Sequence, residues 1–574
     1  MTPLTHRTRA LIVATTLSLA FSALGVRLFQ LHVIRHSELA QLAAANRELV
    51  VHRQGRRGEI RDCNGNLLAN SQSVRIVAAD PSITAARAAD VARQLAPLLK
   101  LDQSALVAKL SSVGRYVRLK TKVDEDTAQQ IRALKLKGIG FEDQLLRSYP
   151  NGILASHILG FVDSEHRGVQ GIEASMQDYL EGTDGYEVIE RDRKGREIRA
   201  LRSQDIGPRD GYNVVLTIDQ VIQHIAETEL EKAMAENHPQ AGVIIVSRPK
   251  TGEILAMSCR PTFDPNNPGA SPADARRNRC ISDVAEPGST FKIVACSGAL
   301  NDGLVTLSDQ FDCENGAFLY AGRMLHDAHP YGVLSVEEIL FHSSNIGAAK
   351  VALHVGPSRL YNYITQFGLG RKTGIALPGE VSGIAHPLSR WNKLSITRIP
   401  MGHEIAVTPI QMLMAMNAVA NGGRLMKPLV VKGIVDADGK TLLEYQPQQV
   451  NQCITPRASM LMATALRKVV TPEGTAPKAA IAGYDVAGKT GTAQKIENGQ
   501  YVRKYYSSFI GYVPASDPEI SILVSLDDPA RGAYYGGSVS GPVFRAVAEQ
   551  VLQYLNIPPQ FNLDGNDKKV ASLS

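Results

Sequence analysis

Ser289 and Lys292, in the sequence Ser-Thr-Phe-Lys, have the residue types and the spacing of a nucleophile and its base. An apolar run follows over 291–300 and ends before an Asn-Asp-Gly sequence at 301–303, which predicts a buried helix opened by Ser289. The i,i+3 spacing places both side chains on one face. A serine hydroxyl needs a neighbouring base, and burial together with the helix dipole lowers the pKa of a lysine. The pair predicts serine acyl transfer, although the motif alone also fits an N-cap serine followed by a surface lysine.

A second polar group, Ser343-Ser344-Asn345, is expected at a junction between two helices. Ser335 and Glu338 form a capping-box pattern that predicts the start of the first helix, and the second is predicted over 347–354. Ser343 can relay a proton between Lys292 and a leaving amine, and Asn345 can bind a substrate amide. Taken alone, the triplet is equally typical of an ordinary polar helix junction.

The sequence Lys489-Thr490-Gly491 supports two incompatible chemistries. Together with Gly483 it matches the phosphate-binding pattern G-x-x-x-x-G-K-T, which requires a helix to begin after the lysine. Instead, an Asn-Gly turn signal follows at 498–499, and the segment 501–513 is rich in strand-forming residues. Lys489 is therefore predicted on a strand that enters a hairpin, and the phosphate-binding match is accidental.

On such a strand, Lys489-Thr490-Gly491 is the third element of a serine acyl-transfer site. An edge strand can pair with an extended peptide, so Lys489 and Thr490 are expected to bind the peptide's carboxylate. The Thr492 amide is expected to donate to the oxyanion together with the amide of Ser289. Two other Lys-Thr-Gly sequences, at 250–252 and 372–374, are predicted in a turn and a loop, where they cannot serve this purpose.

Length and composition indicate a protein of two or three domains. The chain has 574 residues, of which 44% are hydrophobic and 21% charged, and a net charge of +6 without an arginine-rich run interleaved with aromatics. No nucleic-acid partner is expected. The six cysteines have no metal-ligand spacing, so neither a metal nor a cofactor is predicted. Most cysteines are expected to be small buried hydrophobes, and a Cys259–Cys280 disulfide is conceivable.

The N-terminal segment predicts a single membrane anchor. Arg7 and Arg9 precede an apolar stretch over 11–34. Arg27 is the one lysine or arginine within it, and the stretch is long enough to span a bilayer. The leading positive charges place residues 1–10 in the cytoplasm and the remaining chain outside. A cleaved signal peptide is the alternative, but the apolar run continues past its small residues.

The order of predicted elements indicates an α+β fold from about residue 210. A strand at 214–218 precedes a helix that Asp219 starts, and two short strands follow at 242–247 and 253–257. After a helix-rich middle, three strands are predicted over 485–527 and a closing helix over 541–555. Strands at both ends with helices between them predict one central sheet that joins early and late segments.

These motifs together resemble the class B penicillin-binding proteins. The resemblance covers nearly the whole length and includes motifs other than the three catalytic sequences described above. They are Arg57-Gly58-Glu59-Ile60-Arg61-Asp62, Arg147-Ser148-Tyr149-Pro150, Gly171-Ile172-Glu173, Leu216-Thr217-Ile218-Asp219, Glu286-Pro287-Gly288-Ser289 and Gly402-His403-Glu404 with Thr408-Pro409. The middle motif is Ser-Ser-Asn rather than Ser-Asp-Asn, which is normal in this class.

The resemblance implies an anchor (11–34), an elongated non-catalytic pedestal of the dimerisation type (35–209), and a transpeptidase domain with a central antiparallel sheet flanked by helices, as in serine β-lactamases (210–559). A disordered tail is expected over 560–574. Ser289 would be acylated, Lys292 would be the base, and Ser343 and Asn345 would assist. Lys489, Thr490, Gly491 and Thr492 would bind the carboxylate and the oxyanion.

The implied reaction is the cross-linking of peptidoglycan stem peptides that end in D-Ala-D-Ala, at the outer face of the inner membrane. An amine acceptor would resolve the acyl-enzyme, β-lactams would trap Ser289, and a glycosyltransferase polymerase and other division proteins would be partners. The chain looks most like the septal branch in three sequences, Asp527-Asp528-Pro529, Tyr534-Tyr535-Gly536-Gly537 and Gly541-Pro542-Val543-Phe544. The alternatives are an elongation-specific transpeptidase, a membrane-anchored serine β-lactamase or sensor, and an inactive division scaffold.

Overall fold

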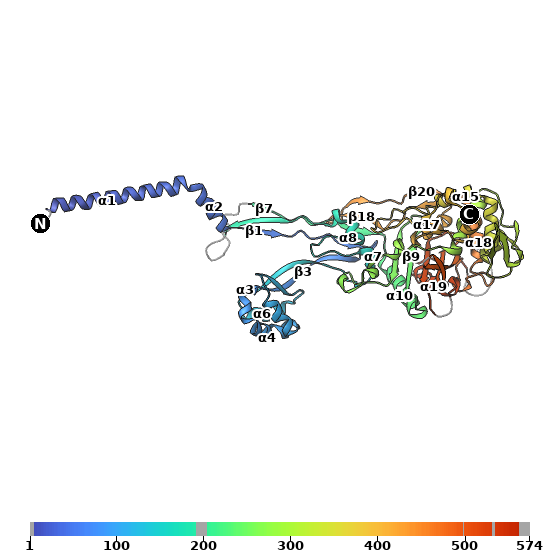
Figure 1. Cartoon of the computed structure of the whole chain (residues 1–574), viewed down its shortest axis with the longest axis horizontal. Coiled ribbons are helices and arrows are strands. Elements are labelled where there is room, and N and C mark those ends of the chain that lie inside the picture. Colours follow the sequence, from blue (N-terminus) through green and yellow to red (C-terminus); the bar gives the residue numbers. More distant parts are fainter. Residues whose placement is uncertain (1–4, 191–203, 498, 531–533, 562–574) are drawn as a thin grey trace. The chain divides into compact units, whose positions relative to one another are not determined.

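The computed structural model describes residues 5–190, 204–497, 499–530 and 534–561 (Figure 1). The chain divides into two compact units. The first contains the residues up to 56 together with 182–211, and the second contains 57–181 together with the chain from 212 onward. Most of the tail predicted as disordered, from residue 562 onward, lies outside the described residues.

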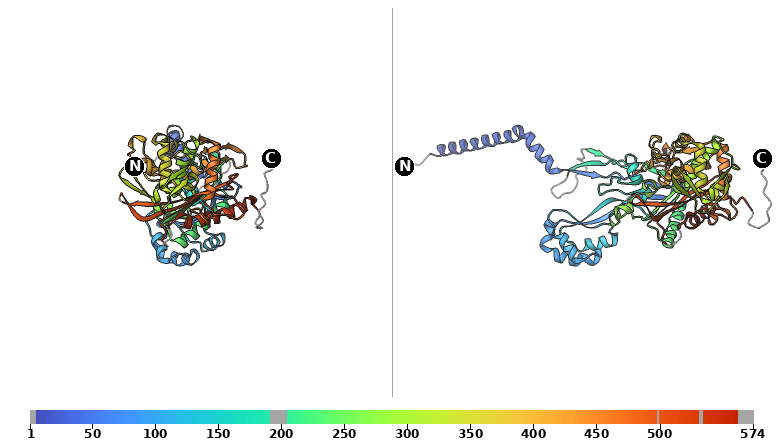
Figure 2. Two further views of the ribbon diagram at one scale, coloured as in Figure 1. Left: turned by 90° about the vertical axis from the view of Figure 1, so that its right-hand side faces the viewer. Right: turned by 45° about the vertical axis from the view of Figure 1, so that its right-hand side comes forward.

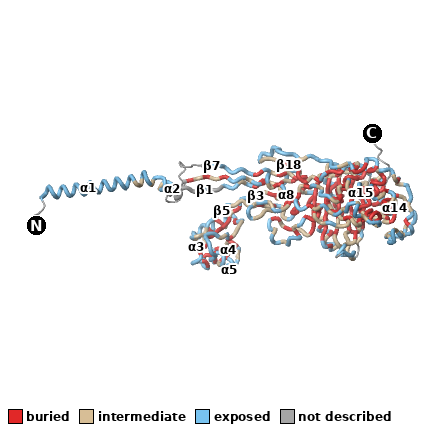
Figure 3. Tube along the Cα trace, turned by 45° about the horizontal axis from the view of Figure 1, so that its top comes forward, coloured by how far each residue is buried: buried red, intermediate tan, exposed pale blue. Residues whose placement is uncertain are grey.

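The first unit begins with a long apolar helix. Helix α1 (His6–Phe29) continues through the π-helical η1 (Gln30–Ile34), and no residue of either is buried (Figure 3). Among the described residues this is the one helix long and apolar enough to cross a membrane. An apolar helix without a protein partner on any side is suited to lipid, in agreement with the anchor predicted over 11–34. Helix α2 (His36–Arg47) leads into a sheet of order β1-β6-β7, formed by β1 (Glu48–Arg53), β6 (Gly185–Glu190) and β7 (Gln204–Ile206).

The second unit contains a seven-stranded sheet built around the long strand β3 (Leu67–Ala79). Strand β5 (Ile139–Ser148) pairs with β3 along ten residues, and the remaining order is β19-β18-β8-β2-β3-β4. The other strands are β2 (Ile60–Arg61), β4 (Val117–Lys120), β8 (Asn213–Leu216), β18 (Val431–Val435) and β19 (Thr441–Glu444). The sheet therefore combines segments from before residue 150 and after residue 210.

A small helical cluster packs around the end of β3. Helices α4 (Ala88–Leu99), α5 (Gln103–Leu110) and α6 (Glu125–Ala133) bury Val91, Leu95 and Leu106 in a separate core with β3 and β4 (Figures 1 and 2).

Three of the motifs outside the catalytic sequences form a buried ionic network. The Glu173 carboxylate, which has no exposed surface, accepts hydrogen bonds from Arg57 Nε and Arg147 Nε at 2.6 Å each, and from the Tyr149 hydroxyl at 3.2 Å. A buried carboxylate is stable only when it is paired and hydrogen-bonded. The network gives these three motifs a structural role in the fold.

The larger core surrounds a five-stranded antiparallel sheet of order β10-β9-β23-β22-β21. Its strands are β9 (Ala241–Ser247), β10 (Ile254–Arg260), β21 (Ala487–Glu497), β22 (Gln500–Val513) and β23 (Ile520–Asp527). Strand β9 pairs with β23, so early and late segments are joined, as predicted. Strand β21 lies at one edge and pairs with β22 alone in this sheet.

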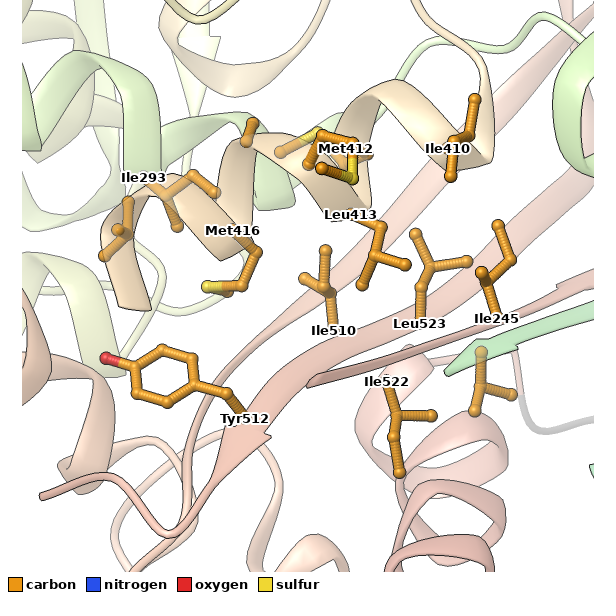
Figure 4. Close-up of a cluster of buried hydrophobic side chains, with 14 of the residues drawn as sticks. Ile245, Ile293, Ile410, Met412, Leu413, Met416, Ile510, Tyr512, Ile522 and Leu523 are labelled. Carbon is orange, nitrogen blue, oxygen red and sulfur yellow. The ribbon is translucent and has the colours of Figure 1, made fainter. Parts of the chain in front are cut away.

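Helices cover both faces of this sheet. Helices α10 (Gln220–Asn237) and α19 (Gly536–Tyr554) pack on it and on each other, and α17 (Pro409–Ala420) packs on β22 and β23. In Figure 4, Leu413 of α17 points toward Ile510 and Leu523, whereas Ile522 points to the opposite face. This alternation follows from the two-residue period of a strand. The predicted α+β fold class is confirmed.

Candidate active site

Ser289 lies on a single 3-10 turn, η6 (Gly288–Phe291), that leads directly into α12 (Lys292–Asn301). The sequence predicted an α-helix opening at Ser289, so the α-helix begins three residues later than expected. In a 3-10 turn the side chains at i and i+3 eclipse, and Lys292 Nζ lies 2.9 Å from Ser289 Oγ. The tighter 3-10 turn therefore places the Ser289 hydroxyl and the Lys292 amine within hydrogen-bonding distance.

Ser343 stands between helices α13 (Val336–Phe341) and α14 (Asn345–Val355), as predicted, and the capping box of Ser335 and Glu338 is present. Its backbone has a φ of 63°, in the left-handed region that non-glycine residues rarely adopt. Lys292 Nζ donates to the carbonyl of Ser343 at 2.5 Å, to its Oγ at 3.1 Å and to Asn345 Oδ1 at 2.9 Å. The junction thus supplies three oxygen acceptors around the amine.

Strand β21 brings the third motif to the same place. Lys489 Nζ donates to Ser343 Oγ at 2.9 Å, so two lysine amines contact one hydroxyl. Hydrogen bonds link Ser289, Lys292, Ser343, Asn345 and Lys489 in a continuous chain. Lys489 is on a strand and not at the start of a helix, which agrees with rejecting the phosphate-binding interpretation.

Three residues of β21, Thr490, Gly491 and Thr492, lie beside η6. We call η6, which carries Ser289, the nucleophile turn. Thr490 Oγ1 lies 3.0 Å from Thr475 Oγ1, and Thr492 Oγ1 accepts a hydrogen bond from the Gly536 amide at the start of α19 at 3.1 Å. A Cβ atom at Gly491 would lie 2.4 Å from Ser508 Oγ and 3.1 Å from the Pro287 carbonyl. Only glycine allows β21 to approach the turn this closely.

The other two Lys-Thr-Gly sequences lie outside this cluster. Lys250 forms ion pairs with Asp517 and Glu519 at 2.6 and 2.7 Å, in a turn. Thr373 donates its amide and hydroxyl to Glu380 in a loop. Both placements agree with the sequence prediction, because neither lysine lies near Ser289 or Ser343.

Burial governs the electrostatics of the site. Lys292 and Lys489 have no exposed surface. Burial lowers the pKa of Lys292 to about 7, although the negative charge of Asp327 acts to raise it. Burial and then the charge of Lys292 hold the pKa of Lys489 well below its usual range. Lys292 can therefore be an uncharged amine near neutral pH, as a base for Ser289 must be.

Asp327 is a site residue that the sequence motifs did not reveal. Its carboxylate accepts hydrogen bonds from the Ser344 hydroxyl at 2.7 Å, the Ile346 amide at 3.0 Å and the Asn345 amide. It therefore caps the first turn of α14, where a negative charge is stabilised, and fixes Asn345. Asp327 follows β13 (Arg323–His326), and no local pattern distinguishes it from other loop aspartates.

A second unpredicted contact joins the nucleophile turn to the hairpin tip. The Tyr501 hydroxyl donates to Glu286 Oε2 at 3.0 Å, and His403 Nδ1 lies 2.7 Å from the same hydroxyl. The Glu404 amide also donates to Glu286 at 3.0 Å. Glu286 and His403 belong to motifs recognised in the sequence, but their contact with Tyr501 depends on the fold.

Among the described residues, no group of three or more His, Cys, Asp or Glu side chains is arranged to hold a metal ion. The chemistry available at the cluster comes from its hydroxyl, amines and amides. A hydroxyl next to a buried amine, beside an edge strand with backbone amides, can carry out acyl transfer through a covalent serine ester.

Residues 242–549 match the family described as penicillin binding protein transpeptidase domain, and residues 52–216 match the penicillin-binding protein dimerisation domain. The chain belongs to the class B penicillin-binding proteins. The recognition made from the sequence motifs is confirmed. The transpeptidase family is a family of serine acyltransferases, so this class B penicillin-binding protein is an enzyme of that type.

Relatives and solved structures cover most of the chain. Stage V sporulation protein D of Bacillus subtilis is 34% identical and covers 97% of this chain and 87% of its own length. Peptidoglycan D,D-transpeptidase FtsI of Escherichia coli is 33% identical, with 88% and 84% covered. The crystal structure of penicillin binding protein 3 from Mycobacterium tuberculosis, complexed with aztreonam, has a TM-score of 0.69 and 28% identity, with 89% of this chain and 98% of that chain covered.

Replacing Asp327 by Asn is expected to lower the free energy of unfolding by about 1–2 kcal/mol, because a charged cap of α14 is lost. It should also move the pH midpoint of penicillin acylation to lower values, because Asp327 raises the pKa of Lys292. Urea unfolding and acylation rates at a series of pH values measure the two effects.

The matched control is Asp312→Asn, since the Asp312 carboxylate accepts a hydrogen bond from the Glu314 amide at 2.8 Å at an exposed position. It should leave the pH midpoint unchanged. An Asp327→Asn protein with the wild-type midpoint and wild-type stability would refute the positioning role.

Proposed function

We propose that the chain is a peptidoglycan D,D-transpeptidase that acts through an acyl-enzyme on Ser289. The contact that carries this proposal is the 2.9 Å distance between Ser289 Oγ and the fully buried Lys292 amine. The name of the Escherichia coli relative, a peptidoglycan D,D-transpeptidase, supports the substrate class. The substrate is a stem peptide that ends in D-Ala-D-Ala.

In the first step, Ser289 Oγ attacks the carbonyl carbon of the penultimate D-Ala and its proton passes to the neutral Lys292 amine. The resulting oxyanion accepts hydrogen bonds from the Ser289 and Thr492 amides. When the intermediate collapses, the bond to the terminal D-Ala breaks, and the proton reaches the leaving amine from Lys292 through Ser343. The two contacts of Ser343 Oγ, 3.1 Å to Lys292 and 2.9 Å to Lys489, support this relay.

Substrate recognition uses the other members of the cluster. Lys489 and Thr490 bind the terminal carboxylate, Asn345 holds a peptide amide, and Gly491 lets the strand approach the nucleophile turn. In the second step, an amine of a neighbouring stem peptide attacks the ester carbon and gives its proton back through Lys292, which restores Ser289. β-Lactams acylate the same oxygen, and the aztreonam complex of the mycobacterial relative supports this for the family.

The chain is anchored in the inner membrane with its enzymatic part outside the cytoplasm. The one long apolar helix of the described residues and the two arginines in its first turn support this topology. The proposed division is a cytoplasmic N-terminus over 1–10, an anchor over 11–34, a pedestal over 35–209, a transpeptidase domain over 210–559 and a tail over 560–574. A glycosyltransferase polymerase and other division proteins are the proposed partners.

Within the class, the proposed role is septal cross-linking during division. The sequence Asp527-Asp528-Pro529 and the aromatic pair Tyr534 and Tyr535 support this branch, and Tyr534 stacks on Tyr505 with ring centroids 4.2 Å apart. An elongation-specific transpeptidase has the same chemistry and is the second candidate. A β-lactamase or an inactive scaffold would differ in the fate of the ester at Ser289.

Ser289→Ala is expected to abolish the covalent penicillin adduct while leaving the fold intact, because only one oxygen atom is removed. Mass spectrometry of the intact protein detects the adduct, and circular dichroism checks the fold. In the unmutated protein the adduct should persist, whereas a β-lactamase would release it rapidly.

Ser297→Ala is the matched control, because Ser297 is a buried serine of α12, the helix after Ser289, and its hydroxyl bonds to the Val294 carbonyl. It should keep the adduct. A penicillin adduct on the Ser289→Ala protein would disprove the assignment of the nucleophile.

The acylation rate is expected to rise with pH and level off above the pKa of Lys292, which is about 7. Below that pKa the amine is protonated and cannot accept the Ser289 proton, so the rate should fall about tenfold per pH unit. Stopped-flow acylation with a chromogenic β-lactam measures the profile.

Lys292→Arg keeps a positive charge but has no accessible neutral form, so it should be inactive across the profile. A wild-type rate that does not change between about pH 5.5 and about pH 8.5 would contradict a lysine base with this pKa.

Depletion of the protein in its own cells should produce filaments, because septal cross-linking would stop while side-wall growth continues. Phase-contrast microscopy measures cell length and width. Complementation by the wild type but not by Ser289→Ala is the control for the activity. Round cells after depletion would support the elongation role instead.

A further inference from the structure

Two of the six cysteines, Cys259 and Cys280, lie together at an edge of the five-stranded sheet. Cys259 is on the edge strand β10, and Cys280 is in α11 (Arg279–Ser282), which packs on β9 and β10. Both residues have no exposed surface. Cys280 Sγ lies 3.5 Å from the carbonyl oxygen of Ser258, the residue before Cys259, and both cysteines are free thiols in this structure.

Polar contacts of Asn278 hold α11 against this strand. Asn278 Oδ1 accepts a hydrogen bond from the Cys280 amide at 3.2 Å. Its Nδ2 donates to Met257 Sδ at 3.3 Å and to the His157 carbonyl at 3.5 Å. Asn278 therefore links the backbone of Cys280 to Met257 of β10 and to His157, which keeps the Cys280 sulfur beside this strand.

A histidine base faces the pair. His157 Nε2 bonds to the Ala275 carbonyl at 2.9 Å. Because a carbonyl only accepts, Nε2 carries the proton, and Nδ1 is an acceptor in the neutral ring. Burial acts to raise the pKa of Cys259, but interactions with Cys280 and His157 lower it well below its usual range. Burial and interactions with Cys259 raise the pKa of Cys280.

The same neighbours are not arranged as a metal site. Within the described parts of the chain, no group of three or more His, Cys, Asp or Glu side chains could hold a metal ion. Two adjacent thiols with a base have one other common chemistry, which is thiol–disulfide exchange.

We propose that Cys259 and Cys280 form a disulfide that ties the edge strand β10 to α11 in the folded enzyme. The proposal rests on the proposed extracytoplasmic location, since disulfides persist in oxidising compartments. Before α11 docks on β10, Cys259 gives its proton to His157 and attacks a protein or glutathione disulfide, which forms a mixed disulfide and releases one thiolate. Cys280 then gives its proton to the released thiolate and, as α11 docks, attacks the Cys259 sulfur and releases the second thiol. Two cysteine thiols are oxidised, and one external disulfide is reduced to two thiols.

The bond would fix the start of the segment that carries the nucleophile. Helix α11 ends at Ser282, and the chain then runs through Glu286 to Ser289. Arg279 of α11 pairs with Asp283 at 2.9 Å, so the helix is already linked to that segment. Since both sulfurs are buried, an external disulfide reaches them only before α11 docks on β10, and the bond is expected to form during folding.

The test uses the full-length protein, extracted from membranes of the cells that make it. Free thiols are blocked with N-ethylmaleimide during unfolding in acid, and the protein is then reduced and treated with iodoacetamide. Peptide mass spectrometry should find iodoacetamide on Cys259 and Cys280 and N-ethylmaleimide on the other four cysteines. A digest without reduction should contain the two peptides joined, with the mass of two hydrogen atoms missing.

N-Ethylmaleimide on both Cys259 and Cys280 in the extracted protein would overturn the proposal. A sample refolded from guanidinium in a buffer of oxidised and reduced glutathione then shows which premise failed. If the two peptides are joined in the refolded sample, the sulfurs can form the bond and the proposed extracytoplasmic location is wrong. If they are separate, the two sulfurs do not pair and the structural argument is wrong. Penicillin labelling of the same samples tests the proposed enzymatic function independently.

The melting temperature gives a second readout. Protein refolded with the bond should melt on the order of 5 °C higher than protein refolded under reductant, because the crosslink restricts the unfolded chain. The double variant Cys259→Ser with Cys280→Ser should show no such difference and should keep penicillin labelling. Cys453→Ser is the matched control, because this buried thiol bonds to the Gln366 carbonyl instead. Cys453→Ser should retain the difference in melting temperature between the two refolded samples. A double variant that also retained this difference would refute the Cys259–Cys280 disulfide.

Discussion

The structure of this enzyme depends on two lysine amines that are fully removed from solvent. Lys292 and Lys489 both contact the Ser343 hydroxyl, and neither side chain forms a direct ion pair with a carboxylate among the described residues. Burying an uncompensated ammonium costs several kcal/mol, so the fold disfavours charge on both amines at once. Asp327, which caps α14 nearby, moderates this effect without neutralising it.

Close backbone approaches hold the groups in place. A Cβ at Gly402 would lie 2.2 Å from the Gly288 carbonyl oxygen, so the loop before His403 rests directly on the nucleophile turn. On the other side of the turn, Gly491 keeps β21 near Pro287. The turn is thus confined between two backbone segments, and the position of Ser289 follows from packing rather than from the flexibility of its side chain.

Sequence patterns predicted the elements whose signals are local. The Asp219 N-cap of α10, the capping box before α13 and the placement of Lys489 on a strand all depend on residues within a few positions of each other. The 3-10 turn at Ser289 was not predicted, because Pro287, Gly288 and the distant Gly402 determine it together. Asp327 and the contact between Tyr501 and Glu286 were also not predicted, since their partners are 18 and 215 positions away.

In the proposed mechanism, the two buried amines would let a carboxylate bound beside Lys489 prepare Ser289 for attack. Burial and then the charge of Lys292 lower the pKa of Lys489. A carboxylate beside Lys489 would stabilise its protonated form, because an opposite charge at short range raises a lysine pKa. Repulsion between the amines is mutual, so a charged Lys489 favours the neutral form of Lys292. Binding of the peptide terminus at β21 would therefore favour the form of Lys292 that can accept the proton of Ser289.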